Sequence, residues 1–151
     1  MKAPFKTLAT AVCGLLLGLP TAQAESIEFV YINVGETGHE LTVWPGQVTL
    51  EAGELYRFVV SNPSEDIHVV AAPELAATVK TEELRIGELL RLDVPAPPLD
   101  MTTGITLQPN MTIEWTFTPL AEGVYKLGCD DPVHAAAGMH AMIDVISQDV
   151  L

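Results

Sequence analysis

The chain has 151 residues, with 7 Lys and Arg against 20 Asp and Glu, a formal net charge of −13 at pH 7 and a mean hydropathy of +0.30. That length fits one ordinary domain. The acidity argues against nucleic acid or an anionic membrane surface as the partner, because both would repel the chain. Eleven Gly and eleven Pro favour a turn-rich β protein over a helical bundle.

The first 24 residues have the pattern of a secretory signal peptide. Lys2 and Lys6 form a basic start, and the apolar stretch 8–19 is too short to span a bilayer. Small residues occupy the two positions that a signal peptidase reads before a cut after Ala24. We therefore expect export to a periplasm or a thylakoid lumen, and one mature domain over 25–151 without a membrane span. A single-span anchor is the alternative.

Cleavage would change the charge and the cysteine count. The mature chain keeps five Lys and Arg against twenty Asp and Glu, a net charge of −15. It also keeps a single cysteine, Cys129. An exported protein with one thiol forms no internal disulfide, so Cys129 is either buried and inert or present for its chemistry.

Short segments with one-sided alternation of apolar residues follow along the mature chain. The alternation is clearest between Asn110 and Pro119, where Ile113, Trp115 and Phe117 point to one side. The predicted strands are 27–34, 48–50, 55–61, 110–119, 123–129 and a final strand through 143–145. Such strands and turns are typical of an all-β protein, and we predict an antiparallel β-sandwich.

The stretch around residues 73–100 is less regular than the rest. Residues 74–92 are compatible with a short helix or with two irregular strands, and the pattern does not decide between them. The proline-rich run 95–98 is predicted to be a loop. We therefore expect an irregular insertion in the sandwich at this point.

Three metal-binding side chains lie within eleven residues near the end of the chain. Cys129 ends a strand face that it shares with Tyr125 and Leu127, and four-residue loops separate it from His134 and His134 from Met139. Thiolate, imidazole and thioether are soft or borderline donors. Two His and one Cys in a trigonal plane with a long axial Met is a copper electron-transfer site, whereas zinc usually takes four Cys or His ligands.

Such a site needs a second histidine, and His68 is the best candidate. It follows the turn that ends the strand 55–61. His39 lies in a loop and is expected to be solvated, and His140 should alternate outward together with Met142 in the final strand.

The run Cys-x4-His-x4-Met, preceded by Gly-x-Tyr-x-x-x-Cys over 123–129, resembles the small blue-copper proteins, the cupredoxins. The stretch 48–53, leading to the first histidine, is similar to their strand, turn and first-ligand segment. The resemblance spans most of 26–147. It implies a Greek-key β-sandwich that binds one type 1 copper ion, cycling between Cu(I) and Cu(II). The ligands it implies are His68, Cys129, His134 and Met139.

Three positions depart from the common pattern of that family. Val69 stands where many members have an Asn that ties the two ligand loops together. Asp130 follows the cysteine in place of Ser or Thr, and Val133 precedes the histidine in place of Gly. The hydrogen bonds around the sulfur should therefore differ. A carboxylate near the metal would lower the potential if it is ionised and unscreened.

The resemblance implies an exported one-electron carrier rather than an enzyme, since the four donor positions would all be filled. It also implies that His134 exposes one ring edge beside a small apolar patch at 135–137. With a mature charge of −15, long-range attraction favours a basic redox partner, such as a cytochrome or an oxidase. We expect the carrier itself to be a monomer.

Two other functions are compatible with the sequence. A copper carrier or chaperone that buffers copper or delivers it to an oxidase draws support from the run Met139-His140-Ala141-Met142, whose donors suit Cu(I). A β-sandwich interaction module without metal is the third interpretation. The three functions can be distinguished by whether the protein binds copper, in which oxidation state, and whether the bound Cu(II) has an intense blue colour.

Overall fold

The structure is a computed structural model, and it describes residues 26–87 and 99–147. The expected signal peptide and the predicted loop 95–98 lie outside the described residues. The elements are β1 Glu28–Val34, β2 Val43–Trp44, β3 Gln47–Glu51, β4 Tyr56–Ser61, β5 His68–Ala71, α1 Pro73–Ala76, β6 Val79–Ile86, β7 Ile105–Leu107, β8 Thr112–Pro119, β9 Gly123–Cys129, α2 Pro132–Ala136 and β10 His140–Ile146.

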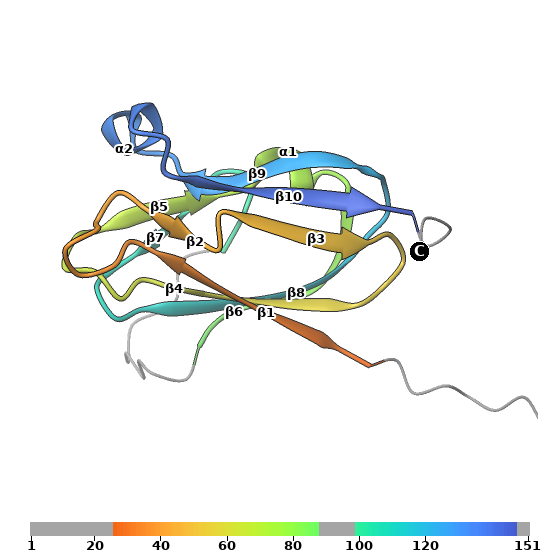
Figure 1. The fold of residues 1–151 in the computed structure, drawn as a ribbon. Coiled ribbons are helices and arrows are strands. Elements are labelled where there is room, and N and C mark those ends of the chain that lie inside the picture. Colours follow the sequence, from red (N-terminus) through yellow and green to blue (C-terminus); the bar gives the residue numbers. More distant parts are fainter. Residues whose placement is uncertain (1–25, 88–98, 148–151) are drawn as a thin grey trace, which may run out of the picture.

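Two five-stranded sheets pack face to face (Figure 1). Their strand orders are β2-β1-β4-β8-β6 and β3-β10-β9-β5-β7, which confirms the predicted β-sandwich. Each sheet contains one parallel pair, β1 with β4 and β3 with β10, so the sheets are mixed rather than purely antiparallel. Strand β3 belongs to the second sheet, so the chain leaves the first sheet after β2 and returns to it with β4, which lies beside β1 and runs parallel to it.

Alternating side chains of the central strands fill the space between the sheets. Tyr56, Phe58 and Val60 of β4 are buried. Trp115 and Phe117 of β8, the neighbouring strand of the same sheet, pair with Phe58 and Tyr56 and are buried beside them. The rings of Phe58 and Phe117 meet edge to face, with centroids 4.8 Å apart. Each such side chain contributes roughly 1.5–3 kcal/mol through burial, and together they make the core rigid beneath the ligand loops.

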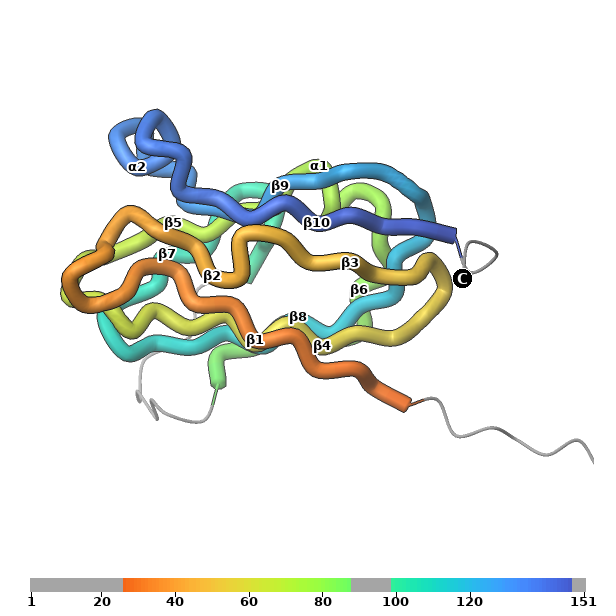
Figure 2. Tube along the Cα trace, in the orientation of Figure 1, coloured from red at the N-terminus to blue at the C-terminus, as the bar shows by residue number. Residues whose placement is uncertain are grey.

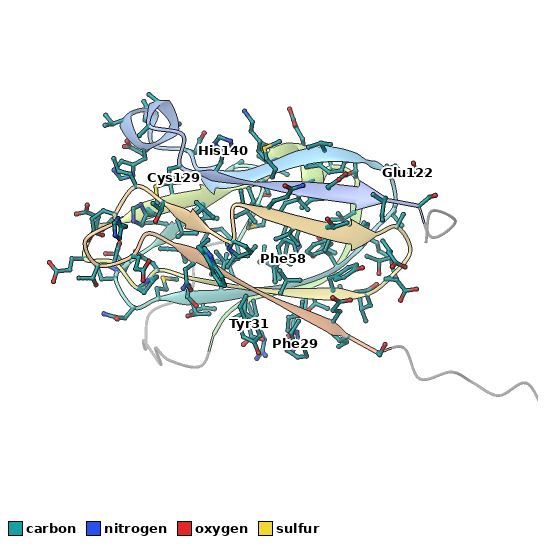
Figure 3. All side chains as sticks on the ribbon, viewed as in Figure 1. Phe29, Tyr31, Phe58, Glu122, Cys129 and His140 are labelled. Carbon is teal, nitrogen blue, oxygen red and sulfur yellow. The ribbon has the colours of Figure 1, made fainter. Side chains whose placement is uncertain are left out.

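Strand β1 presents its aromatic face outward. Phe29 and Tyr31 share one side and are 51% and 63% exposed, whereas the alternate residue Ile32 is buried. Figure 3 shows Phe29 and Tyr31 projecting from the outer face while Phe58 lies between the sheets. The two rings stack, and the Arg57 guanidinium lies 5.6 Å from the Phe29 centroid, an attractive cation–π arrangement.

The irregular stretch contains both a helix and a strand. Helix α1 is a single turn, and β6 is an eight-residue strand that pairs with β8 through a register shift between Thr81 and Glu83. Arg85 of β6 donates to Glu114 of β8 at 2.6 Å. Most β6 side chains are exposed or half-buried, so the strand lacks the alternation that would have predicted it. Neither described helix is long and apolar enough to cross a bilayer.

Four loops gather at one end of the sandwich. They are residues 35–42 after β1, 62–67 after β4, 108–111 before β8 and 130–139 after β9, and the tube in Figure 2 follows them around this end. Asn110 N–H donates to Asn62 O at 2.7 Å, which joins two of the loops directly. All four predicted donor residues lie at this end.

Candidate metal centre

The structure brings three of the four predicted donors together. One ligand atom each from His68, Cys129 and His134 lies within 4.8 Å of the other two. The two Nδ1 atoms of the histidines are 3.3 Å apart, and Cys129 Sγ is 3.4 Å from His134 Nδ1. Bonds from a metal to nitrogen are about 2.0 Å long, so two donors separated by 120° lie about 3.5 Å apart. The spacing therefore fits trigonal binding of one ion.

Strand β9 places the cysteine. Cys129 is the last residue of β9, on the buried face with Tyr125 and Leu127, and it is 5% exposed. At Gly128 the neighbouring strand passes so close that a Cβ would lie 2.5 Å from Met139 O. Cys129 N–H donates to the same Met139 carbonyl at 3.0 Å. The glycine thus lets β10 close tightly over the ligand end of β9.

A capped turn of helix places His134. The Asp131 carboxylate accepts hydrogen bonds from His134 N–H at 3.2 Å and from Val133 N–H at 2.9 Å, and these bonds hold the pKa of Asp131 below its usual value. Pro132 follows the cap, as is common at the first position of a helix. The short helix α2 turns His134 back toward Cys129.

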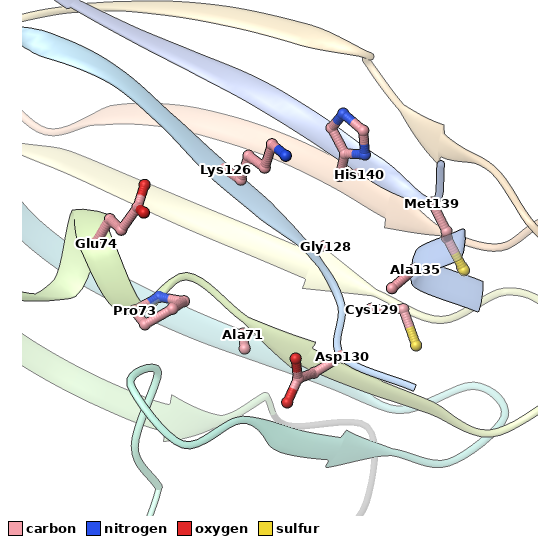
Figure 4. Close-up of a pocket in the computed structure, with 10 residues that line it drawn as sticks. All are labelled: Ala71, Pro73, Glu74, Lys126, Gly128, Cys129, Asp130, Ala135, Met139 and His140. Carbon is pink, nitrogen blue, oxygen red and sulfur yellow. The ribbon is translucent and has the colours of Figure 1, made fainter. Parts of the chain in front are cut away.

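Met139 supplies the fourth predicted donor. It is 1% exposed, and Figure 4 shows its sulfur and that of Cys129 directed toward the same end of the sandwich. Met139 N–H donates to His134 O at 3.2 Å, which closes the loop between these two residues. The thioether is therefore on the same side of the ligand loop as the thiol.

His68 is the most deeply placed donor. It is the first residue of β5 and is 0% exposed. Burial lowers the pKa of His68, and the nearby His134 lowers it further. The neutral imidazole is the form that binds a metal, so this surrounding favours the binding-competent state.

A buried polar network holds the other side of the His68 ring. His68 Nε2 is 3.0 Å from Ser64 Oγ, and Ser64 Oγ donates to Asn62 Oδ1 at 2.7 Å. Asn62 and Ser64 are 0% and 2% exposed. A metal-binding histidine almost always uses its second nitrogen in this way, which fixes the orientation of the ring.

The backbone of Val69 joins the two ligand segments at the position where many cupredoxins use an Asn side chain. Val69 N–H donates to Cys129 Sγ at 3.4 Å, and Val69 O accepts from Asp130 N–H at 2.7 Å. The Asp130 side chain is exposed, and Figure 4 shows it directed away from the sulfur of Cys129. Water screens such a charge, so the expected lowering of the potential by this carboxylate should be small.

The remaining histidines lie away from the cluster, as predicted. His39 is exposed in the loop after β1, and His140 is half-buried on the outer face of β10 with Met142. His140 lines an open groove of about 250 Å³ that also has Lys126, Asp130 and the two sulfur residues Cys129 and Met139 on its walls (Figure 4).

Sequence reasoning missed three residues around His68. The sequence predicts only a turn between the strand 55–61 and His68, although Ser64 N–H donates to Asn62 Oδ1 at 3.0 Å, a bond typical of the Asn-x-Ser spacing. Gly35 lies against both His68 and Ser64, since a Cβ there would be 2.7 Å from His68 Nε2 and 2.8 Å from Ser64 Oγ. No sequence signal joins Gly35 to a residue so far along the chain.

A scan of family models and a search of curated proteins found no match to this chain. Solved structures do match. A dithionite-reduced auracyanin from the photosynthetic bacterium Roseiflexus castenholzii is 22% identical, with a TM-score of 0.52 over 78% of this chain and 96% of that one. Auracyanin A, a "blue" copper protein from the green thermophilic photosynthetic bacterium Chloroflexus aurantiacus, is 21% identical, with a TM-score of 0.51 over 80% and 100%. A multicopper oxidase from Campylobacter jejuni is 12% identical, with a TM-score of 0.58 over 86% of this chain and 32% of the oxidase.

The chain therefore has a cupredoxin-like fold. Within that fold, His68, Cys129 and His134 form a cluster whose spacing suits ligands of one metal ion, and the buried Met139 closes the same loop.

Proposed function

We propose that the protein is an exported type 1 copper protein that carries one electron at a time between redox partners. The observation that carries the proposal is the spacing of the three donors, 3.3 and 3.4 Å between adjacent ligand atoms. Copper bound there would supply one-electron chemistry. The likeness to a "blue" copper protein supports the same choice of metal.

The donors differ in how close they lie to solvent. His68, Cys129 and Met139 are at most 5% exposed, whereas His134 is half-buried in a helix whose following residues, 135–137, are exposed alanines. A partner that docks on this small apolar surface would come closest to the metal at His134. Cys129 and Met139 line the open groove that contains His140, but each is at most 5% exposed, so little of either donor is open to a substrate, which favours a carrier over an enzyme.

The direction of the side chains after Met139 argues against the copper-chaperone alternative. Met139 and Ala141 are buried, whereas His140 and Met142 lie on the outer face of β10. Side chains on opposite faces of a strand do not chelate one ion.

Charge around the site supports a basic partner. The four loops at this end contain six acidic residues and no Lys or Arg: Glu36, Glu40, Glu65, Asp66, Asp130 and Asp131. Opposite charge on the partner would raise the association rate, and salt would lower it. We expect the rate of electron transfer to a basic cytochrome to fall as ionic strength rises, and to fall less steeply in a variant with Glu65 and Asp66 changed to Asn or Gln.

Addition of Cu(II) to the protein 25–151 tests the central proposal. We expect an intense visible thiolate-to-copper band that one equivalent of reductant removes, and complete loss of the band in Cys129→Ala. Circular dichroism of that variant checks that it still folds. A colourless protein that takes up only Cu(I) would support the copper carrier, and a protein that binds neither state would overturn both. The N-terminal sequence of the secreted protein tests the cut after Ala24.

A further inference from the structure

The hydrogen bonds behind His68 run in one direction only, and the amide of Asn62 sets that direction. Asn62 Nδ2 lies 2.7 Å from Asp66 O and 3.0 Å from Leu107 O, and Asn62 Oδ1 accepts from Ser64 N–H at 3.0 Å. Carbonyl oxygens only accept and a backbone N–H only donates. In the reverse orientation, the amide oxygen would face two carbonyl oxygens and the amide nitrogen would face a backbone N–H. The three hydrogen-bond partners therefore determine the orientation of the amide.

Ser64 passes that direction on to the histidine. Its hydroxyl has one hydrogen, which it donates to Asn62 Oδ1 at 2.7 Å, with Asp66 O as a second acceptor at 3.3 Å. Both acceptors draw the hydrogen away from the ring. Ser64 Oγ is thus left to accept from His68 Nε2–H at 3.0 Å. A proton on Nε2 leaves His68 Nδ1 bare, and Nδ1 is the atom that faces His134.

Gly35 covers this hydrogen bond from the loop after β1. Its φ is +80°, and a Cβ there would lie 2.7 Å from His68 Nε2 and 2.8 Å from Ser64 Oγ. The backbone of the loop therefore packs directly on the bond. Since Asn62, Ser64 and His68 are at most 2% exposed, bulk water does not offer Nε2 another partner.

We propose that Asn62 and Ser64 are positioning residues that hold His68 in one tautomer, with the proton on Nε2 and Nδ1 free, before any metal binds. The opposite tautomer would place two acceptors, Nε2 and Ser64 Oγ, against each other at 3.0 Å. As an extension that rests on the proposed function, the same two residues keep the ring in one orientation in both oxidation states of copper.

Nitrogen-15 NMR of the histidine rings in the metal-free protein tests the tautomer directly. We expect His68 in the wild type to show a single tautomer, with a proton on Nε2 that exchanges slowly with solvent. Ser64→Ala should give a mixture of both tautomers and lose that protection. Asn62→Ala should give a smaller change in the same direction, because the freed Ser64 hydroxyl can then donate to Nε2.

Ser61→Ala is the matched control. It removes a hydroxyl three residues away, at the end of β4, which bonds to Thr112 Oγ1 at 2.9 Å and not to His68. This variant should keep the wild-type signals. A merely structural loss of a hydroxyl would affect both serine variants, whereas the proposed role affects Ser64→Ala alone.

Copper-loaded protein tests the extension. Ser64→Ala should bind copper about tenfold more weakly, the lower end of the usual cost of losing such a partner, and should shift the reduction potential, while Ser61→Ala should do neither. A single, protected Nε2–H tautomer in Ser64→Ala would overturn the proposal. If Ser64→Ala does not fold, the same result in Asn62→Ala would overturn it. Altered tautomers with an unchanged potential would overturn the extension alone, and failure of the wild type to bind copper would overturn the proposed function while the NMR result stands.

Discussion

Residues 129–139 bring three donors to the candidate site within eleven residues, whereas residues 62–68 bring one donor and a buried polar network behind it. The first segment is largely exposed between Cys129 and Met139 and is shaped by its own Asp131 cap. The second is held by bonds to Leu107 in β7 and by contact with Gly35 after β1.

The difference shows how a metal site divides its construction between local and distant parts of the chain. Spacing along the chain is enough to return His134 and Met139 toward Cys129. His68 instead depends on β7 and on the loop after β1, each of which must pack correctly. We therefore expect the site to tolerate changes within the exposed loop better than changes around His68 or beneath β10.

Gly128→Ala should have the largest effect on stability, because the new Cβ would lie 2.5 Å from Met139 O and 2.9 Å from His140 Cα. Backbone cannot give way as a flexible side chain can, so we expect a loss of about 3 kcal/mol or more in the free energy of unfolding. Gly138→Ala, in the exposed loop at φ +82° with nothing within 4 Å, should cost only about 1 kcal/mol. Urea unfolding measures both, and equal losses would contradict the close packing of β9 and β10.

Gly35→Ala and Gly38→Ala form a second matched pair. Both glycines lie in the same loop with φ near +80°, but only Gly35 contacts His68 and Ser64. We expect each variant to lose about 1 kcal/mol in the free energy of unfolding because of the backbone conformation. Gly35→Ala should lose roughly 2 kcal/mol more because its Cβ overlaps His68 and Ser64. Only this variant should also disturb the copper spectrum. The same spectrum in both variants would show that the loop does not support His68.

Met139→Leu separates packing from metal binding in the exposed segment. The side chains are similar in volume, so the metal-free protein should lose less than about 1.5 kcal/mol. The reduction potential should rise, because loss of a donor disfavours the more highly charged Cu(II). Voltammetry measures the potential, and an unchanged value would exclude Met139 as a ligand.

The pH dependence of the metal-free protein gives the smallest expected effect. Burial and His134 lower the pKa of His68 in the folded state, while in the unfolded chain it is about 6.5. Below that pH the unfolded chain binds a proton that the folded protein resists, so the free energy of unfolding should fall as pH falls through 6.5. His68→Gln should reduce this slope, and His39→Gln, which removes an exposed histidine, should not. Equal slopes in the two variants would argue against a buried neutral His68.

The sequence predicted the parts of the fold that alternate strongly, and the structure confirms them. In β4, β8 and β9 one side of each strand is buried and the other faces water, so period two is visible. Strands β2 and β7 have only two and three residues, too few to show a period. No residue of β6 is fully buried, so its pairing with β8 is decided by tertiary contacts that its own residues do not reveal.

The candidate site divides in the same way. The spacing from Cys129 to Met139 could be read directly, and His68 was reached by elimination among the histidines. The roles of Ser64 and Gly35 could not be predicted, because each depends on which distant backbone lies within 3 Å. The outward direction of Phe29 on β1 was also hidden, since both faces of that strand are apolar.

The pairing of β5 with β9 has a consequence for maturation. Val70 lies opposite Cys129 and Ala71 opposite Gly128, so the thiol and His68 meet only in this register. A slip of one residue would turn Cys129 to the opposite face of the sheet and separate the donors. Because a ligand stabilises only the state that binds it, uptake of a metal at the candidate site would select chains whose two strands are correctly aligned, and metal content would report the quality of folding.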